Sequence, residues 1–253
     1  MRRPMVVANW KMNTRASDAY ILATTIRNAV APIEGIEVVI CPPSIWLSEV
    51  SDIVKKDGKV NVGAQNMFYE PEGAYTGEIS PLMIVDIAKY VIVGHSERRN
   101  YFHENDIIIN EKVVAALKYG LVPIVCVGED NKSDPLSDAP NKLREALMHI
   151  PKNRYKDIVV AYEPKWAISG FGGKKVASID HIIKEFTRLR EVIGRDSSIL
   201  YGGSVNEKQI VELAKRPEID GVLVGSASIR ASSFLEICRT WAKSKSFRGE
   251  VLT

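Results

Sequence analysis

The chain has 253 residues, of which 45% are hydrophobic and 26% are charged, and its formal net charge is +3. These values are ordinary for a globular protein, and the length suits either one large domain or two small ones. The charge is far too small for the electrostatic footprint of a nucleic-acid-binding protein. No stretch approaches the length of a membrane-spanning helix. We therefore expect a protein with neither nucleic-acid nor membrane partners.

The cysteines indicate a reducing compartment. Cys41, Cys126 and Cys238 are odd in number and form no CxxC pair, whereas secreted disulfide frameworks use cysteines in even numbers. A short apolar run near the N-terminus is interrupted by Asn9 and Lys11 before the core of a signal peptide can form. The sequence therefore predicts a cytoplasmic protein.

Short apolar runs alternate with amphipathic segments along the whole chain. The runs have the length of buried strands, and the segments have the spacing of helices. The predicted strands are Met5–Ala8, Val38–Cys41, Val60–Ala64, Tyr90–Val93, Val122–Val127, Ile158–Ala161, Ile199–Tyr201 and Val222–Val224. The predicted helices are Ser17–Val30, Ile45–Lys55, Pro81–Ile87, Asp106–Tyr119, Asn141–His149, Ile179–Val192, Glu207–Ala214 and Ser232–Ala242. This alternation predicts an α/β fold, a (β/α)8 TIM barrel that forms a single domain over residues 1–253.

An open, doubly wound parallel sheet is the structural alternative. Such a sheet is expected to carry a G-x-G-x-x-G motif after its first strand. The first predicted strand ends at Ala8 and is followed by Asn9, Trp10 and Lys11, without that motif. We therefore favour the closed barrel, in which a functional site is built at the carboxyl ends of the strands.

A candidate general base follows the sixth predicted strand. Glu163 stands directly after the apolar run, and Pro164 restricts the backbone on its far side. The next stretch contains Gly170, Gly172 and Gly173, a composition suited to a moving loop that exposes backbone N–H groups. A carboxylate at the mouth of a buried strand can serve as a general base. The simpler alternative is a solvated glutamate at a strand end.

Polar residues also follow other strands. Lys11 follows the first strand, and His95 and Glu97 follow the fourth, so barrel closure would bring these side chains and Glu163 to one rim. Ser96 is placed to cap a helical turn, and a ring at a helix N-terminus is biased towards its neutral form. A neutral imidazole can donate a hydrogen bond to a carbonyl oxygen. The simpler alternatives are a surface lysine and a core histidine.

The remaining histidines, His103, His149 and His181, lie in polar or helical surroundings and show no metal-ligand spacing. We predict that all three lie on the surface, and we predict no metal site.

Two glycine–serine turns indicate a phosphate-binding site. Gly203 and Ser204 follow the seventh predicted strand, and Gly225 and Ser226 follow the eighth. Glycine lets backbone N–H groups approach an anion, and a helix N-terminus adds favourable partial charge. The loops after strands seven and eight are the usual phosphate position in these barrels. Tight connections use glycine in any case, which is the alternative explanation.

Five motifs together resemble the triosephosphate isomerase family. They run in order from the first strand to the last: Asn9-Trp10-Lys11-Met12-Asn13, Val93-Gly94-His95-Ser96-Glu97-Arg98-Arg99, Ala161-Tyr162-Glu163-Pro164, Tyr201-Gly202-Gly203-Ser204-Val205 and Leu223-Val224-Gly225. The resemblance implies an isomerase that interconverts dihydroxyacetone phosphate and glyceraldehyde 3-phosphate without metal or cofactor. This family is itself a standard example of titratable groups tuned to separate roles.

The resemblance also implies the roles of individual residues. Glu163 would remove a proton beside the carbonyl, neutral His95 would polarise that carbonyl, and Lys11 would offset negative charge. The implied catalytic residues are Asn9, Lys11, His95, Glu97 and Glu163, and the implied substrate-binding residues are Asn9, Lys11, Ser169, Gly170, Gly203, Ser204, Gly225 and Ser226. The segment from Trp166 to Lys174 would close over the phosphate as a lid.

A homodimer is implied as well. The connection over residues 66–78 is long for a compact barrel, and connections of that kind are usually functional. In the family it is the interface loop, so Tyr75, Thr76 and Gly77 are the implied interface residues. The alternative is a floppy surface loop.

Three departures from the family leave the substrate open. Lys165 stands where valine is usual, the following loop is about two or three residues longer than usual, and Ser226 replaces a glycine. A phosphorylated four-carbon ketose, a tetrulose phosphate, is therefore an alternative substrate. A non-catalytic sugar-phosphate-binding protein is a further alternative, although such a protein is expected to have lost Glu163 or His95.

Overall fold

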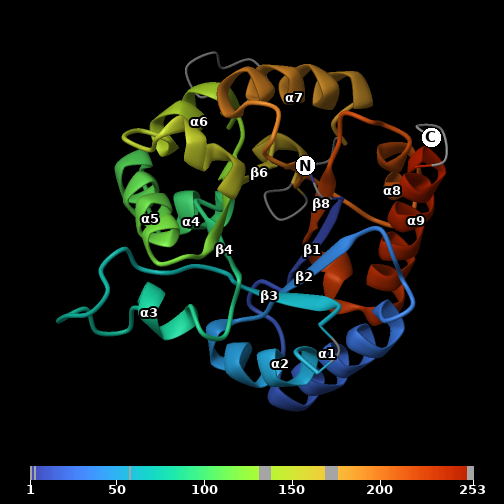
Figure 1. Cartoon of the computed structure of the whole chain (residues 1–253), viewed down its shortest axis with the longest axis horizontal. Coiled ribbons are helices and arrows are strands. Elements are labelled where there is room, and N and C mark those ends of the chain that lie inside the picture. The colour runs from blue at the N-terminus through green and yellow to red at the C-terminus, as the bar shows by residue number, and fades with distance from the viewer. Residues whose placement is uncertain (1, 3, 57, 131–137, 169–175, 250–253) are drawn as a thin grey trace.

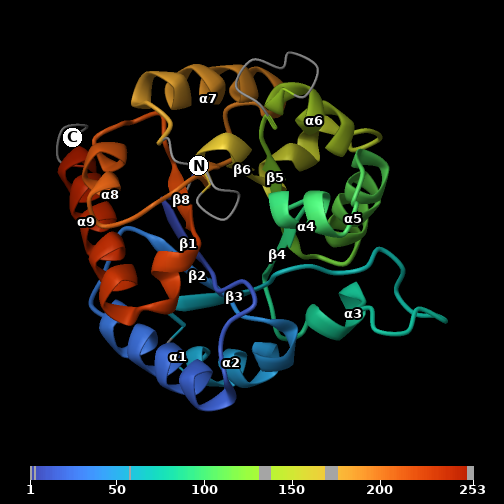
Figure 2. The same ribbon diagram turned by 180° about the vertical axis from the view of Figure 1, so that it is seen from behind.

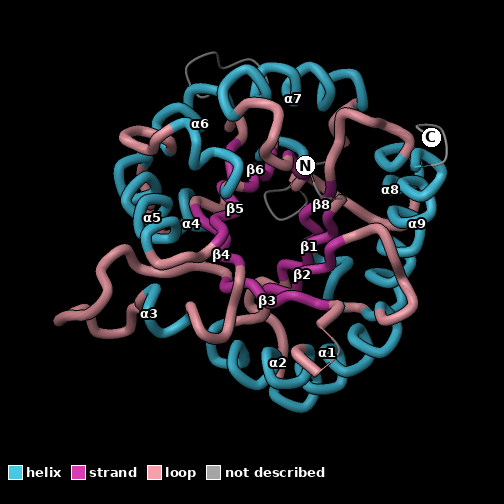
Figure 3. The backbone as a smooth tube through the Cα atoms, in the orientation of Figure 1, coloured by secondary structure: helices cyan, strands magenta, loops and turns pink. Residues whose placement is uncertain are grey.

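A computed structural model describes residues 2, 4–56, 58–130, 138–168 and 176–249 of the chain. Parallel strands form a closed ring at its centre, and helices cover the outside of the ring (Figure 3). The strands, in chain order around the ring, are β1 Met5–Asn9, β2 Glu37–Cys41, β3 Val60–Ala64, β4 Tyr90–Val93, β5 Val122–Val127, β6 Val159–Tyr162, β7 Ile199–Tyr201 and β8 Gly221–Val224. β1 pairs with both β2 and β8, which closes the barrel. The predicted (β/α)8 barrel is confirmed; its extent over residues 1–253 stays a prediction.

Helices connect successive strands on the outside of the barrel (Figure 1). The α-helices are α1 Ala16–Val30, α2 Leu47–Val54, α3 Pro81–Ile84, α4 Ser96–Tyr101, α5 Asp106–Lys118, α6 Ala139–Ala146, α7 Ile179–Ile193, α8 Gln209–Ala214 and α9 Ala231–Gly249. Short 3-10 helices are η1 Ser44–Trp46, η2 Lys152–Asp157, η3 Lys165–Ala167 and η5 Ser226–Ile229. Within the described part of the chain, no helix has the length and apolar character needed to cross a membrane.

The element boundaries differ from the predicted ones where local hydrogen bonding competes with the hydrophobic pattern. β6 begins at Val159 rather than Ile158, because the Ile158 N–H group donates to the Tyr155 carbonyl in η2. The predicted helix from Ile45 begins as η1, and α3 is shorter than predicted. α9 extends past Ala242, where the apolar spacing used to predict its end stops.

The barrel interior and its outer face are filled by alternate strand residues. Met5 and Val7 of β1 pack inside with Ile92 and Leu200, whereas Val6 belongs to the layer between strands and helices. Since side chains on a strand alternate between faces, both faces of each strand are buried. This explains why the strands read in the sequence as continuous apolar runs.

Two strand neighbours fix the backbone that carries Glu163. The Glu163 N–H group donates to the Val127 carbonyl at 2.7 Å, and the Gly202 N–H group donates to the Tyr162 carbonyl at 2.8 Å. Gly128 makes the first approach possible, because a Cβ atom there would collide with the Glu163 backbone. The carboxyl end of β6 therefore lies firmly between those of β5 and β7.

Replacing Gly128 by alanine should destabilise the protein by about 1–3 kcal/mol, because the methyl group would force the backbone of Glu163 outward. Urea unfolding measures the loss. Gly194→Ala is a matched control: its Cβ atom would meet no described atom within 4 Å, so its cost is limited to backbone strain at φ +85°. A Gly128→Ala protein as stable as wild type would contradict the close-approach explanation.

Candidate active site

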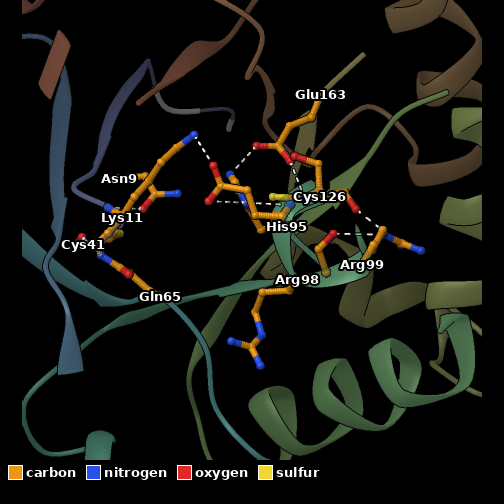
Figure 4. Close-up of polar contacts among 12 residues, drawn as sticks. Asn9, Lys11, Cys41, Gln65, His95, Arg98, Arg99, Cys126 and Glu163 are labelled. Carbon is orange, nitrogen blue, oxygen red and sulfur yellow. Dashed lines mark hydrogen bonds and ion pairs between the residues drawn. The ribbon is translucent and has the colours of Figure 1, made fainter. Parts of the chain in front are cut away.

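The carboxyl ends of the strands surround a cavity of about 260 Å³. The structure brings together around it all the described residues that the sequence predicted for catalysis and substrate binding: Asn9, Lys11, His95, Glu97, Glu163, Gly203, Ser204, Gly225 and Ser226. Figure 4 shows Lys11 and Glu163 reaching toward the His95 region from opposite sides. Ile168 and Leu223 complete apolar parts of the wall. Sequence reasoning missed both, because an apolar side chain carries no chemical signal, whether it follows η3, as Ile168 does, or lies in β8, as Leu223 does.

Glu163 is a buried carboxylate held at two points. Its Oε1 atom lies 3.1 Å from His95 Nε2, and its Oε2 atom accepts a hydrogen bond from the Ser96 N–H group at 3.1 Å. Burial alone raises the pKa of Glu163, but His95 and the Ser96 N–H group outweigh it and hold the pKa of the carboxyl below its ordinary value of 4.5. The carboxylate is therefore ionised at neutral pH. The part played by the Ser96 N–H group was not predicted.

His95 is the N-cap residue of α4, a position that the sequence analysis assigned to Ser96. Its Nδ1 atom accepts a hydrogen bond from the Glu97 N–H group at 3.2 Å. A nitrogen that accepts a hydrogen bond carries no proton, so the ring proton of neutral His95 is on Nε2. Nε2–H points toward Glu163 Oε1 and the cavity. The ring can thus donate a hydrogen bond without carrying positive charge.

Lys11 is held in an uncommon backbone conformation beside the cavity. Its φ of +53° lies in the left-handed region, which a side chain other than glycine rarely adopts. Asn9 Oδ1 accepts the Lys11 N–H group at 3.0 Å, and Gln65 Nε2 donates to the Lys11 carbonyl at 3.0 Å. The ammonium group pairs with Glu97 Oε1 at 2.6 Å. Such strain persists where surrounding contacts over-determine it, as they do at many functional sites.

The two glycine turns, which follow β7 and β8, form part of the cavity wall. Ser226 begins η5 directly after Gly225, so N–H groups of a helical turn lie at this wall. A Cβ atom at Gly203 would collide with the Tyr201 hydroxyl, which explains glycine there. The Ser204 hydroxyl donates to the Ala167 carbonyl at 3.0 Å, so its proton is engaged within the protein. The site offers backbone donors suited to an anion.

Some predicted residues lie elsewhere. Ser169, Gly170 and the lid segment beyond Ile168 are outside the described residues. Tyr75, Thr76 and Gly77 lie in the connection between β3 and α3, which does not line this cavity.

The prediction for His181 was wrong. His103 and His149 are exposed as predicted, but the His181 side chain is 18% exposed and its Nε2 atom lies 3.1 Å from Glu129 Oε1. Tyr162 and Trp166 also donate to this carboxylate oxygen. No local sequence signal links His181 to Glu129, because their contact depends on how α7 packs.

The family model of triosephosphate isomerase matches residues 4–241, a range that contains every cavity residue named above. The chain belongs to the triosephosphate isomerase family. The predicted resemblance is thereby confirmed.

Relatives that bear the name triosephosphate isomerase are similar over almost their entire length. The protein of Dehalococcoides mccartyi strain CBDB1 is 45% identical over 251 residues, which cover 94% of this chain and 96% of the relative. That of Chloroflexus aurantiacus is 41% identical over 250 residues, covering 94% and 98%. That of Dictyoglomus thermophilum is 42% identical over 252 residues, covering 95% and 100%.

The lowered pKa of Glu163 predicts a pH dependence of stability. Because the folded pKa lies below the ordinary value of 4.5, the stabilisation is fully present above pH 4.5 and is lost as the pH falls through the folded pKa. Glu163→Gln has the same shape but does not titrate. Wild-type protein should therefore lose free energy of unfolding faster than Glu163→Gln below this pH. Urea unfolding of both proteins across the range tests this, and parallel pH profiles would contradict it.

Proposed function

We propose that Glu163 is the general base and neutral His95 the electrophile of the isomerisation performed by this family member. As a triosephosphate isomerase, the chain interconverts dihydroxyacetone phosphate and glyceraldehyde 3-phosphate. The observation that carries the assignment is the 3.1 Å approach of Glu163 Oε1 and His95 Nε2 at one cavity wall. A carboxylate and a neutral donor side by side are the pair that proton transfer next to a carbonyl requires.

The proposed chemistry balances as follows. Glu163 takes the proton from the hydroxymethyl carbon beside the carbonyl, and the C–H electrons form the carbon–carbon double bond of an enediolate. The carbonyl oxygen gains negative charge and receives a hydrogen bond, then a proton, from His95 Nε2. The proton held by Glu163 is then delivered to the neighbouring carbon. His95 Nε2 regains a proton from the hydroxyl group of the first carbon, whose oxygen becomes the new carbonyl, so the aldehyde and the ketone have exchanged places and both side chains have returned to their starting states.

The contacts of Glu163 are those of the protein without substrate. The hydrogen bond from the Ser96 N–H group stabilises the ionised carboxylate and so makes it a weaker base. Reaching a substrate carbon requires the carboxylate to exchange this contact for one with the substrate. Gly202 leaves the space for that movement, because a Cβ atom there would lie 2.8 Å from Glu163 Cγ.

Lys11 supplies the positive charge of the proposed site. Its ammonium group is half-buried and paired with Glu97, so it is held at the cavity without being deeply desolvated. Asn9 keeps the Lys11 backbone in place through its side-chain oxygen. An ammonium group here offsets the charge of the phosphate and of the enediolate that forms during reaction.

The substrate phosphate is proposed to bind at the turns after β7 and β8. Backbone N–H groups around Gly203, Ser204, Gly225 and Ser226 are the donors, and the first turn of η5 adds favourable partial charge. The roles of Ser169 and Gly170, and closure of the lid, stay predictions outside the described residues.

Neither alternative is favoured. A tetrulose phosphate needs more room than a triose phosphate, and every relative cited above is named for the triose substrate. A non-catalytic binding protein would have no use for a buried base beside a neutral imidazole.

Glu163→Gln should lower kcat/KM for glyceraldehyde 3-phosphate by about 10²–10⁴-fold, the contribution of a positioned base. Coupled enzyme assays measure the rate. Inhibition by inorganic phosphate should change little, because the phosphate turns are untouched.

A Glu163→Gln protein with nearly unchanged turnover would contradict the proposed role of Glu163.

A comparison of glyceraldehyde 3-phosphate and a tetrulose phosphate as substrates of the wild-type protein decides between the two substrates. A higher kcat/KM for the tetrulose phosphate would favour the alternative.

The proposal includes a homodimer formed through the loop of residues 66–78. This loop projects from the barrel before α3 (Figures 1 and 2). The Phe68 ring packs on Tyr69 and Tyr75 with centroids 4.2 and 4.6 Å apart, and the Phe68 N–H group donates to the Ile79 carbonyl. These internal contacts favour an ordered docking element over a floppy loop. Tyr75, at 45% exposure, presents apolar surface for a second copy.

Tyr75→Arg should weaken the dimer, since burying an unpaired guanidinium at an interface costs free energy. Sedimentation equilibrium measures the association. The exposed Tyr20 of α1 provides the matched control, and Tyr20→Arg should leave the assembly unchanged. Identical association of both variants would argue against an interface that contains Tyr75, and the neighbouring Thr76 and Gly77 would lose their assignment with it.

The cytoplasmic localisation also stays a proposal. It is supported by the thiols of Cys41, Cys126 and Cys238, which are free and buried, as in proteins of reducing compartments.

A further inference from the structure

One carboxylate oxygen of Glu129 lies within hydrogen-bond distance of three side chains. Glu129 is buried, and its Oε1 atom lies 2.7 Å from the Tyr162 hydroxyl, 2.9 Å from Trp166 Nε1 and 3.1 Å from His181 Nε2. Its Oε2 atom is also buried and has no hydrogen-bond partner among the described residues. The hydrogen bonds that replace the lost hydration of this carboxylate are therefore all made at Oε1. Each donor at Oε1 contributes to the stability of the buried charge.

Two of the three donors come from segments that flank the proposed base. Tyr162 precedes Glu163 on β6, and Trp166 lies in η3, three positions after it. The Glu129 carbonyl also accepts the Lys165 N–H group at 3.1 Å. Glu129 thus holds the chain on both sides of Glu163. His181 reaches the same oxygen from the first turn of α7.

The hydrogen bonds assign the proton of the His181 ring. The Tyr162 hydroxyl has one proton and donates it to Glu129 Oε1. His181 Nε2 faces this hydroxyl oxygen at 3.0 Å and the carboxylate oxygen at 3.1 Å, both of which are acceptors toward it. Nε2 therefore carries a proton and donates it. The imidazole edge also packs on the Trp166 ring, with centroids 5.3 Å apart at 71°.

We propose that His181 is a positioning residue for the isomerisation: through Glu129 it fixes Tyr162 and Trp166, and thereby the placement of Glu163. The inference rests on the proposed role of Glu163. Without the third donor, the Glu129 carboxylate turns toward other partners and its hold on Trp166 weakens. A base displaced by about 1 Å can lose about 10²-fold in rate.

The ring is not needed to start α7. Ser178 caps this helix, and its hydroxyl accepts the backbone N–H group of residue 181 at 3.3 Å, whatever the side chain there. Substitutions of His181 therefore test the contact with Glu129 rather than helix formation.

The test compares His181→Leu, which removes the donor, with His181→Gln, whose amide can donate at similar reach. His181→Leu should lower kcat about 10- to 100-fold with KM changed less than about threefold, since the phosphate turns are untouched. His181→Gln should restore kcat to within about threefold of wild type. His149→Leu, an exposed histidine replaced in the same way, should behave as wild type.

A second readout separates positioning from general destabilisation. With 5-fluorotryptophan incorporated, the fluorine resonance of Trp166, assigned with Trp166→Phe, should shift in His181→Leu and return in His181→Gln. If His181→Leu fails to fold, His181→Asn takes its place, because its short amide cannot reach Glu129.

Three outcomes decide the inference. A loss of kcat with a shifted Trp166 resonance, both rescued by glutamine, supports it. Unchanged kcat in His181→Leu, alongside an inactive Glu163→Gln, overturns the inference and leaves the proposed function standing. An active Glu163→Gln overturns both.

Discussion

A carboxylate buried at the rim of a closed parallel barrel is the constraint on which the site depends. Taking an ionised group out of water costs several kcal/mol unless hydrogen bonds replace the lost hydration. Glu163 finds these at one place, the first turn of α4, where the Ser96 N–H group and His95 Nε2 meet it. That turn lies there because β4 and β6 both pair with β5. The pairing of β4, β5 and β6 therefore provides the hydrogen bonds that keep the proposed base ionised.

On the other side of the cavity, a backbone contact fixes which nitrogen of neutral His95 carries the proton. Glu97 lies between Lys11 and His95, with Oε1 2.6 Å from the lysine ammonium and Oε2 3.6 Å from His95 Nδ1. The Glu97 N–H group donates to that same Nδ1, which leaves it unprotonated. The shorter of the two contacts of the Glu97 carboxylate is thus the one to the lysine. An imidazole held in this way can offer its proton without adding a second cation.

The sequence predicted the barrel and its rim because parallel strands end at one edge, so each residue that directly follows a strand could be placed. The supports of the base could not be placed this way. α4 has six residues, too few to show helical periodicity, and it was seen only as a turn after His95. Glu129 and His181 are 52 positions apart and meet through the packing of α7, so the prediction of a surface histidine failed. Local sequence patterns predict where strands end. They do not predict contacts between distant segments, which depend on how the helices pack around the barrel.

One of the three departures from the family, Lys165, lies among these supports as well. Lys165 stands where valine is usual, and its ammonium group lies 2.9 Å from Asn100 Oδ1 and 3.6 Å from Asp130 Oδ1. Asn100 belongs to α4, the helix whose first turn holds Glu163. A valine side chain has no donor and is too short to make this contact. The segment after Glu163 is thus tied to α4 through Lys165 and to Glu129 through Trp166. Because the rate of a proton transfer depends steeply on where the base lies, both tethers bear on the proposed role of Glu163.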